Sequence, residues 1–159
     1  MLLARCERLS TADHQTHRRY TVEVPPACTE LHIRVHYAPK FVSAADSERL
    51  VRDAIAAQTA NLASRVGENL ATRWAAEYIG AELRVPNLLT ISLDDAVGRY
   101  RGANHRHAED QDLRLGASTA SPGLVPGDLP AGEWALTLSA HTLVSSQCDV
   151  EIQIGAEIA

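Results

Sequence analysis

The sequence is poor in several residue types, and each shortage narrows what the protein can be. Aromatic residues make up only 4% of the 159 residues, so a platform for stacking nucleic-acid bases is not expected. Lys40 is the single lysine, and the formal net charge is −5. A general nucleic-acid-binding protein needs a basic face. We therefore expect no nucleic-acid partner.

Cysteines and long apolar runs are also scarce. Cys6, Cys28 and Cys148 are odd in number and widely spaced, unlike a disulfide framework or a C-x-x-C zinc motif. We expect free thiols, buried or half-buried, in a reducing cytosol. No stretch approaches the ~20 apolar residues of a membrane span, and the apolar run at the start is too short for a signal peptide. The sequence therefore predicts a cytoplasmic protein that does not enter membranes.

What is present is the composition of an ordinary globular domain, with 45% hydrophobic and 22% charged residues. Apolar and polar residues alternate with a period of two in several segments, which predicts half-buried strands. These segments are 20–24, 31–37, 88–93, 134–140 and 148–154. Leu113 and Leu115 indicate a further short strand, and residues 1–18 an edge strand or a lead-in segment.

Residues 43–79 have a different pattern, with apolar side chains at helical spacing and abundant alanine. Ser43 stands three residues before Asp46, as in a capping box. Gly67 lies inside the segment, so one long helix and a helical hairpin both fit. The predicted fold is one mainly β domain over residues 1–159. It is an antiparallel β-sandwich of jelly-roll or immunoglobulin-like kind with this helical insertion.

The apolar stripe of the insertion needs a partner surface. A sandwich closes its own core between two sheets, so the helix must pack across a sheet face or against another chain. We predict a homodimer, because pairing about a two-fold axis is the commonest symmetric solution. The predicted interface consists of Leu62, Val66, Leu70, Trp74 and Tyr78.

Proline and glycine pairs between Gly116 and Gly132 predict a long, turn-rich loop. The phrase Tyr100-Arg101-Gly102, followed by SPGLVPGDLPAGEW at 121–134, resembles the N-terminal β-rich accessory domain of PHP-type metal-dependent phosphoesterases of the CehA/McbA kind. The resemblance is good over 98–138 and loose over 20–154. In that family a similar phrase precedes a strand, the metal-binding barrel follows, and only a short connection occupies the place of the helical insertion.

This resemblance implies an accessory fold, and with it a PHP-type hydrolase as a partner in trans. The His-rich metal motifs of the barrel are not found in these 159 residues, so the resemblance does not carry the hydrolase activity over. The function that the sequence favours is a non-catalytic binding or assembly module without a cofactor.

Four residues next to the loop form the candidate ligand site, namely Arg99, Tyr100, Arg101 and His105. Two arginines with an aromatic ring can grip a carboxylate or a phosphate. Alternatively, the arginines brace the long loop by binding its carbonyls and the side chains of Asp128 or Glu133. We favour the brace.

A second candidate is a divalent metal site at His105, His107 and Asp110, with Glu109 and Asp112 nearby. Residues i and i+2 of an extended segment face the same way, so two imidazoles could share an ion with a carboxylate. Such a site would make the chain a small metal-binding protein or a metal-dependent hydrolase. The alternative, which we favour, is a solvated polar loop, because no apolar anchor lies between Tyr100 and Leu113.

Other polar groups have simpler interpretations. His32 and His36 lie on the polar face of a strand, about 13 Å apart at ~3.3 Å per residue, too far to chelate one ion together. Asp94 and Asp95 are more typical of a turn than of a calcium site, which needs several oxygen ligands. We find no phosphate-binding loop, dinucleotide fingerprint or nucleophile elbow.

Overall fold

The computed structural model describes residues 1–78, 84–105 and 108–159, except for the side chains of Trp74, Glu77 and Tyr78. The chain forms two compact units, which are described separately. One unit combines Met1–Lys40 with Asn87–Ala159, and the other is Phe41–Pro86.

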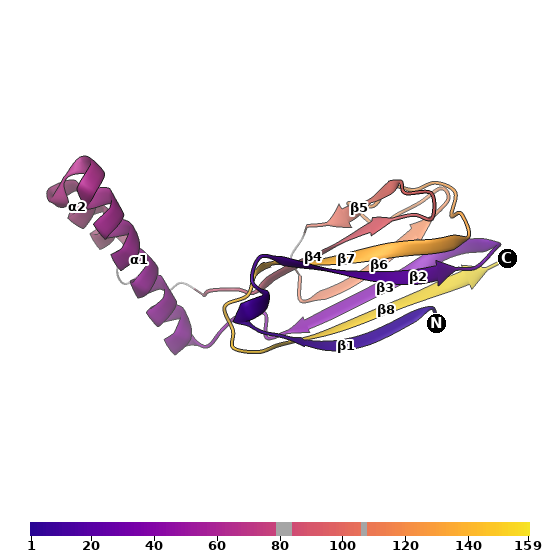
Figure 1. Ribbon diagram of the computed structural model, residues 1–159, viewed down its shortest axis with the longest axis horizontal. Helices are drawn as coiled ribbons and strands as arrows, with labels where there is room; N and C mark the ends of the chain where they lie inside the picture. Colours follow the sequence, from indigo (N-terminus) through magenta and orange to yellow (C-terminus); the bar gives the residue numbers. More distant parts are fainter. Residues whose placement is uncertain (79–83, 106–107) are drawn as a thin grey trace. The chain divides into compact units, whose positions relative to one another are not determined.

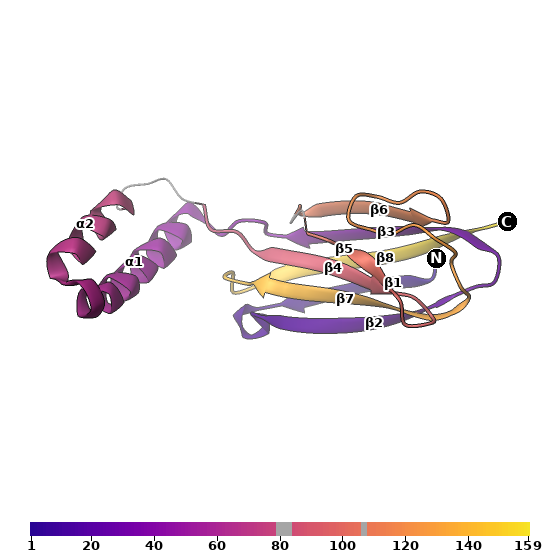
Figure 2. The same cartoon turned by 90° about the horizontal axis from the view of Figure 1, so that it is seen from above.

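The larger unit is a sandwich of two four-stranded antiparallel sheets, which confirms the predicted fold class (Figures 1 and 2). One sheet has the order β1-β8-β3-β6, formed by Leu3–Leu9, Cys148–Ile158, Cys28–Ala38 and Asp110–Gly116. The other has the order β2-β7-β4-β5, formed by Thr16–Val24, Gly132–Thr142, Leu88–Asp94 and Tyr100–Asn104. A short 3-10 helix, Thr11–Asp13, lies between β1 and β2.

The pairing order decides between the two predicted kinds of sandwich. Strand β1 pairs with β8, β2 with β7, β3 with β6 and β4 with β5, all antiparallel. This is one long hairpin rolled up so that successive strands alternate between the sheets, except for β4 and β5 at its tip, which is the jelly-roll arrangement. The helical insertion therefore occupies the β3–β4 connection, and the turn-rich loop is the β6–β7 connection.

The core lies between the inner faces of the two sheets, as the alternating pattern predicts. Leu31, Ile33, Val35 and Tyr37 of β3 are all at most 1% exposed, and Trp134 at the start of β7 is equally buried. The intervening residues of β3 face solvent or are half-buried. Burial of these side chains, at about 25 cal/mol per Å² of apolar surface, is the main source of stability for the sandwich.

Two local expectations need correction. The polar stretch after Tyr100 is not a solvated loop throughout, because residues 100–104 form strand β5, in which Arg101 and Asn104 are buried. Both side chains have hydrogen-bond partners, so the strand needs no apolar anchor to be buried. The last strand also continues beyond Ile154, to Ile158.

Asn87 holds together the two points at which the helical insertion leaves and rejoins the sandwich. Its side-chain amide donates to the carbonyl of Pro39 and to the hydroxyl of Ser145, at 2.8 and 2.7 Å. Its side-chain Oδ1 accepts the backbone N–H of Val144, and its backbone N–H donates to the carbonyl of Lys40. The fully buried Asn87 thus links both ends of the insertion to the connection between β7 and β8.

The smaller unit contains two helices, α1 (Ala44–Val66) and α2 (Glu68–Tyr78), so the insertion is a helical hairpin rather than one helix. Ser43 caps α1, because its hydroxyl accepts the backbone N–H of Asp46. Gly67 separates the helices with a φ of +92°, a left-handed value that favours glycine. Within the described residues, neither helix is long and apolar enough to cross a membrane.

A substitution at Gly102 tests how closely β5 approaches the long loop. Its φ is +104°, and a Cβ built on it would lie 2.2 Å from the carbonyl oxygen of Gly123. We expect Gly102→Ala to lower the free energy of unfolding by about 3 kcal/mol or more, measured by urea denaturation. Gly155→Ala is the matched control, since its Cβ would meet nothing within 4 Å, and should change stability by less than about 0.5 kcal/mol. An equal loss of stability in the two variants would show that β5 and the loop are not in tight contact at Gly102.

Candidate functional site

Arg101, one of the four predicted ligand-binding residues, is 4% exposed and lies under the turn-rich loop. Its guanidinium donates to the carbonyls of Val125, Gly127 and Asp128 at 2.8–3.2 Å and to the carboxylate of Asp95 at 3.4 Å. These bonds engage Nε, Nη1 and Nη2, and the group also lies 5.3 Å from the ring centroid of Trp134. Arg101 therefore braces the loop, as the favoured alternative predicts.

The brace differs from the prediction in its carboxylate partner. Asp128 contributes its backbone carbonyl, and the charge opposite Arg101 is supplied by Asp95, whose side chain is fully buried. Asp95 also accepts the backbone N–H groups of Val97 and Arg99 and the Arg99 guanidinium. Burial alone would raise the pKa of Asp95, but these hydrogen bonds and charges outweigh it and hold the pKa below its ordinary value of 3.8.

Of the other predicted ligand-binding residues, Arg99 shares the carboxylate of Asp95 with Arg101, and all three are exposed where Arg101 is buried. The Arg99 side chain is 59% exposed and pairs with Asp95, and Tyr100 is 59% exposed. His105 is exposed beyond the end of β5. Arg99, Tyr100 and His105 are accessible to a ligand, whereas the Arg101 guanidinium is occupied by the loop. The turn predicted at Asp94 and Asp95 is present, with Gly98 donating to the carbonyl of Asp95.

Of the predicted metal set of His105, His107 and Asp110, the structure describes His105 and Asp110, and it pairs Asp110 with another histidine. His107 lies outside the described residues, and His105 is exposed. Asp110 opens β6, and its carboxylate lies 2.7 Å from Nδ1 of His36 on the neighbouring strand β3. Asp112 pairs in the same way with Arg34, at 3.2 Å.

These pairs belong to the outer face of the β1-β8-β3-β6 sheet, which carries most of the charged side chains that the strands bring together. Strand register places Glu151, His36 and Asp110 in one row across the sheet, and Gln153, Arg34 and Asp112 in the next. The face also holds further charged groups, and carboxylates outnumber arginines. The acidic members are Glu30, Asp110, Asp112, Asp149, Glu151 and Glu157, and the basic ones are Arg8, Arg34 and Arg114.

A depression of about 350 Å³ lies on this outer face. Its lining includes the charged side chains of the two rows and the amide of Gln153. It therefore offers hydrogen-bond donors and acceptors of both signs within a small area, which suits a polar, charged ligand or protein surface better than an apolar one.

A third cluster on the same face joins Glu30, His32 and Glu157, and the sequence did not indicate it. Nε2 of His32 lies 2.6 Å from Oε1 of Glu30 and 3.3 Å from Oε1 of Glu157. The ligand atoms of all three residues lie within 4.8 Å of one another. Arg114 donates to Glu30 from β6, at 2.9 Å. An imidazole and two carboxylates are a donor set that divalent metal ions use.

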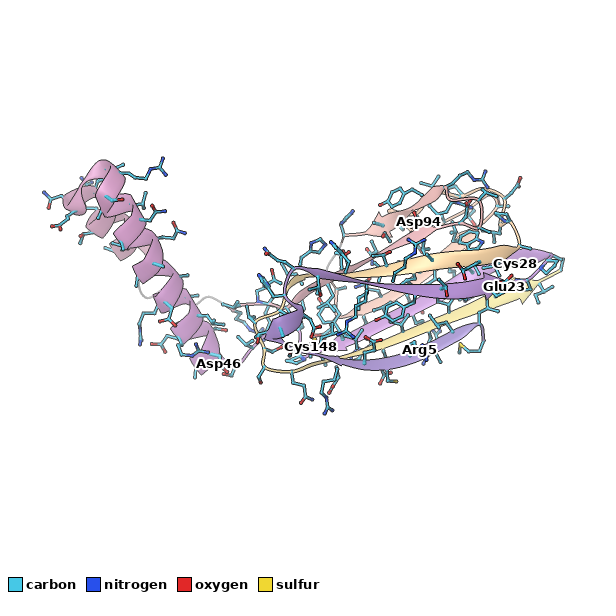
Figure 3. All side chains as sticks on the ribbon, viewed as in Figure 1. Arg5, Glu23, Cys28, Asp46, Asp94 and Cys148 are labelled. Carbon is cyan, nitrogen blue, oxygen red and sulfur yellow. The ribbon has the colours of Figure 1, made fainter. Side chains whose placement is uncertain are left out.

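The cluster lies at the end of the sandwich where β3 begins and β8 ends. Cys28, labelled in Figure 3, opens β3 opposite Ile158, and Glu30 faces Glu157 across the same pair of strands. Extending β8 to Ile158 is what places Glu157 here. The strand predicted from the sequence ends at Ile154, so it could not place the carboxylate of Glu157 next to Glu30.

The three cysteines are free, as predicted, but they are not equally buried. Cys148 is fully buried, and burial raises the pKa of its thiol to about 11. Cys28 is half-buried, and burial also raises its pKa. Cys6 is exposed on β1, contrary to the expectation of buried or half-buried thiols, because β1 is an edge strand whose outer side faces solvent.

The predicted interface residues lie on the helical hairpin. Leu62 of α1 is half-buried, whereas Val66 and Leu70, on either side of Gly67, are 49% and 54% exposed. The side chains of Trp74 and Tyr78 are outside the described part. Buried apolar residues described in this unit are Val42, Ala71 and Ala75. Val66 and Leu70 are thus the large apolar side chains that the described part of the hairpin exposes.

Comparisons with known proteins add little. No protein-family model matches the chain, and no curated protein matches it. Among solved structures, the chain is similar to a protein from Sulfurospirillum deleyianum with a TM-score of 0.34 and 10% sequence identity. The match covers 96% of this chain and 98% of that chain. A likeness at this level carries no argument about function.

Asp95 provides a test of the brace through pH. We expect Asp95→Asn to lower the free energy of unfolding at neutral pH by about 2–4 kcal/mol, because Arg101 loses its buried counter-charge. The folded pKa lies below 3.8, so the carboxylate stabilises the fold above that pH and ceases to do so as pH falls through the folded pKa. The difference in the free energy of unfolding between wild type and Asp95→Asn should therefore become smaller as the pH falls. Urea denaturation at several pH values measures it.

Asp94→Asn is the matched control for this measurement. Asp94 is adjacent, but it forms an exposed pair with Arg19 at 3.1 Å, which contributes less than about 1 kcal/mol. A loss of stability that is the same for both variants, or that does not change with pH for Asp95→Asn, would contradict the role assigned to Asp95.

Proposed function

We propose that the chain is a non-catalytic binding and assembly module, related to the accessory domain of PHP-type phosphoesterases and acting with such an enzyme in trans. The turn-rich loop supports this proposal, because the residues that resemble the PHP-associated family, 100–102 and 121–134, contact one another. Arg101 binds the loop carbonyls and lies against Trp134, and Gly102 packs against Gly123. The shared sequence motif then serves to hold a long loop in place and has no catalytic role.

The observation that carries the proposal is the charged outer face of the β1-β8-β3-β6 sheet with its depression of about 350 Å³. A sheet face of a compact sandwich needs only to be polar, whereas this one concentrates carboxylates around a hollow. Such a face attracts a partner surface that carries basic side chains, because opposite charges speed association and select the partner. We assign this face to the binding of the partner enzyme.

The helical hairpin supplies the assembly part of the proposal. Val66 and Leu70 are exposed apolar side chains at the junction of α1 and α2, and the described buried residues of this unit are small. Large apolar groups at the tip of a hairpin gain stability by pairing with the same groups of a second copy. We therefore propose a homodimer formed through the stripe of Leu62, Val66 and Leu70.

The binding face is tested by titrating the full chain with PHP-type phosphoesterase barrels from the same genome in a calorimeter. We expect one barrel to bind, and Glu151→Lys to weaken binding by about tenfold or more, because it reverses a charge on the depression. Glu23→Lys is the matched control. It makes the same change on an exposed residue of β2 in the other sheet (Figure 3) and should leave binding unchanged.

The same preparations separate this proposal from the metal-dependent alternative. The chain alone should show no turnover of aryl phosphates with manganese, zinc or iron present. Turnover by the pure chain that disappears in a His105→Ala/His107→Ala variant would contradict the proposal and favour a small hydrolase. The absence of binding to any barrel would contradict the role in trans.

The dimer is tested by light scattering at micromolar concentration. We expect the wild-type chain to be a dimer and Leu70→Glu to be a monomer, because a charge replaces an exposed apolar side chain of the stripe. Thr72→Glu, at an exposed position of the same helix, is the control and should stay dimeric. Circular dichroism should show unchanged β structure in both variants. If the wild-type chain is a monomer under these conditions, the proposed homodimer is wrong.

A further inference from the structure

We propose that Glu30, His32 and Glu157 form a binding site for a divalent transition-metal ion of the zinc class. The site does not depend on the proposed partner enzyme and is distinct from the His105, His107 and Asp110 set. Its residues come from two neighbouring strands that the fold aligns, with Glu30 directly opposite Glu157 and His32 in the next row.

The imidazole is the first argument for a ligand. Nε2 of His32 is buried and has no hydrogen-bond partner among the described residues. Oε1 of Glu30 lies only 2.6 Å away, so the two atoms are close but are not aligned as donor and acceptor. Buried polar atoms in folded proteins nearly always have a partner. A cation placed between the nitrogen and the carboxylates would satisfy all of them at once.

The spacing of the donor atoms is the second argument. Two ligand atoms that each lie about 2.1 Å from one zinc ion at a tetrahedral angle are about 3.4 Å apart. The distances from Nε2 to the two carboxylate oxygens are 2.6 and 3.3 Å, so only small side-chain rotations are needed. Three protein ligands leave a fourth position for water, as in zinc sites that remain open to a substrate or partner group.

The surrounding residues leave room for an ion. His32 faces Gly155 on β8 and Arg114 on β6, whereas Glu30 faces Gly116 on β6 and Glu157 on β8, so each of the two residues has a glycine on one side. A Cβ added at Gly155 would meet nothing within 4 Å. The open space is therefore on the β8 side of His32, at Gly155.

Arg114 determines how strongly the site binds. Its guanidinium donates to Glu30 at 2.9 Å and is 60% exposed. Glu30, His32 and Glu157 together with Arg114 can also be read as an ordinary cluster of ion pairs that binds no metal. This is the competing explanation for their arrangement. A metal ion must share Glu30 with Arg114 or displace it, and the positive charge of the arginine opposes the cation at this distance. Removing Arg114 should therefore strengthen metal binding, whereas an ion-pair cluster without a metal predicts no binding in any variant.

The test is calorimetric titration of the full, tag-free chain with zinc, followed by elemental analysis after dialysis. We expect one zinc ion per chain and weaker binding of magnesium, which prefers oxygen ligands. His32→Ala and Glu157→Gln should each reduce the zinc affinity by about tenfold or more, and Arg114→Gln should raise it. His36→Ala is the matched control, because His36 lies on the same face of β3 and pairs with Asp110 instead. It should bind zinc like the wild type.

Zinc should also raise the melting temperature of the wild type and of His36→Ala, and should leave that of Glu157→Gln unchanged, since a ligand of the folded state stabilises it. Circular dichroism verifies that each variant is folded, and Glu157, which is 62% exposed, is the safest position to change. Wild-type protein without stoichiometric zinc would overturn the proposal. So would binding that persists in the His32→Ala/Glu157→Gln variant, or binding lost only in His105→Ala/His107→Ala.

Discussion

A buried guanidinium is stable only when its N–H groups have acceptors and its charge has a partner, and the turn-rich end of this sandwich satisfies that constraint at Arg101. The acceptors come from the turn after β4 and from the loop 117–131, and the indole of Trp134 covers one side. Because Asp95 and the loop carbonyls all bind one group, these bonds restrict the path of the loop. Its proline and glycine residues permit that path, and Arg101 holds it in place.

This constraint divides the charged residues into two groups with different roles. Arg101 and Asp95 are buried and belong to the architecture, so a ligand cannot reach them without displacing the loop. The outer face of the β1-β8-β3-β6 sheet has exposed charges that pair across strands, such as Arg34 with Asp112. Exposed pairs of this kind contribute little to stability. We therefore place the proposed binding of a partner and of a metal ion on this face, and the proposed self-association on the helical hairpin.

The sequence by itself determined the features that depend on neighbouring residues along the chain. A period of two marked the strands around Ile33 and Leu136, and helical spacing with Ser43 as the cap marked the helical insertion, though not its division into two helices. These predictions succeed because side-chain alternation, helix capping and turn formation are set within a few residues. The strands predicted from alternation also limited the fold to a sandwich, since strands joined by turns have few other ways to bury one face.

Only the tertiary structure decided which distant residues meet. Strand β5 is polar in sequence, yet Arg101 and Asn104 are buried because their partners come from other segments. The jelly-roll order rests on pairing β1 with β8, which lies almost the whole chain away. The register of β3 with β8 likewise brings Glu157 beside Glu30 and His32. Alternation shows which face a residue occupies, but the neighbour across the strand follows from register, which is set by the packing of the whole core.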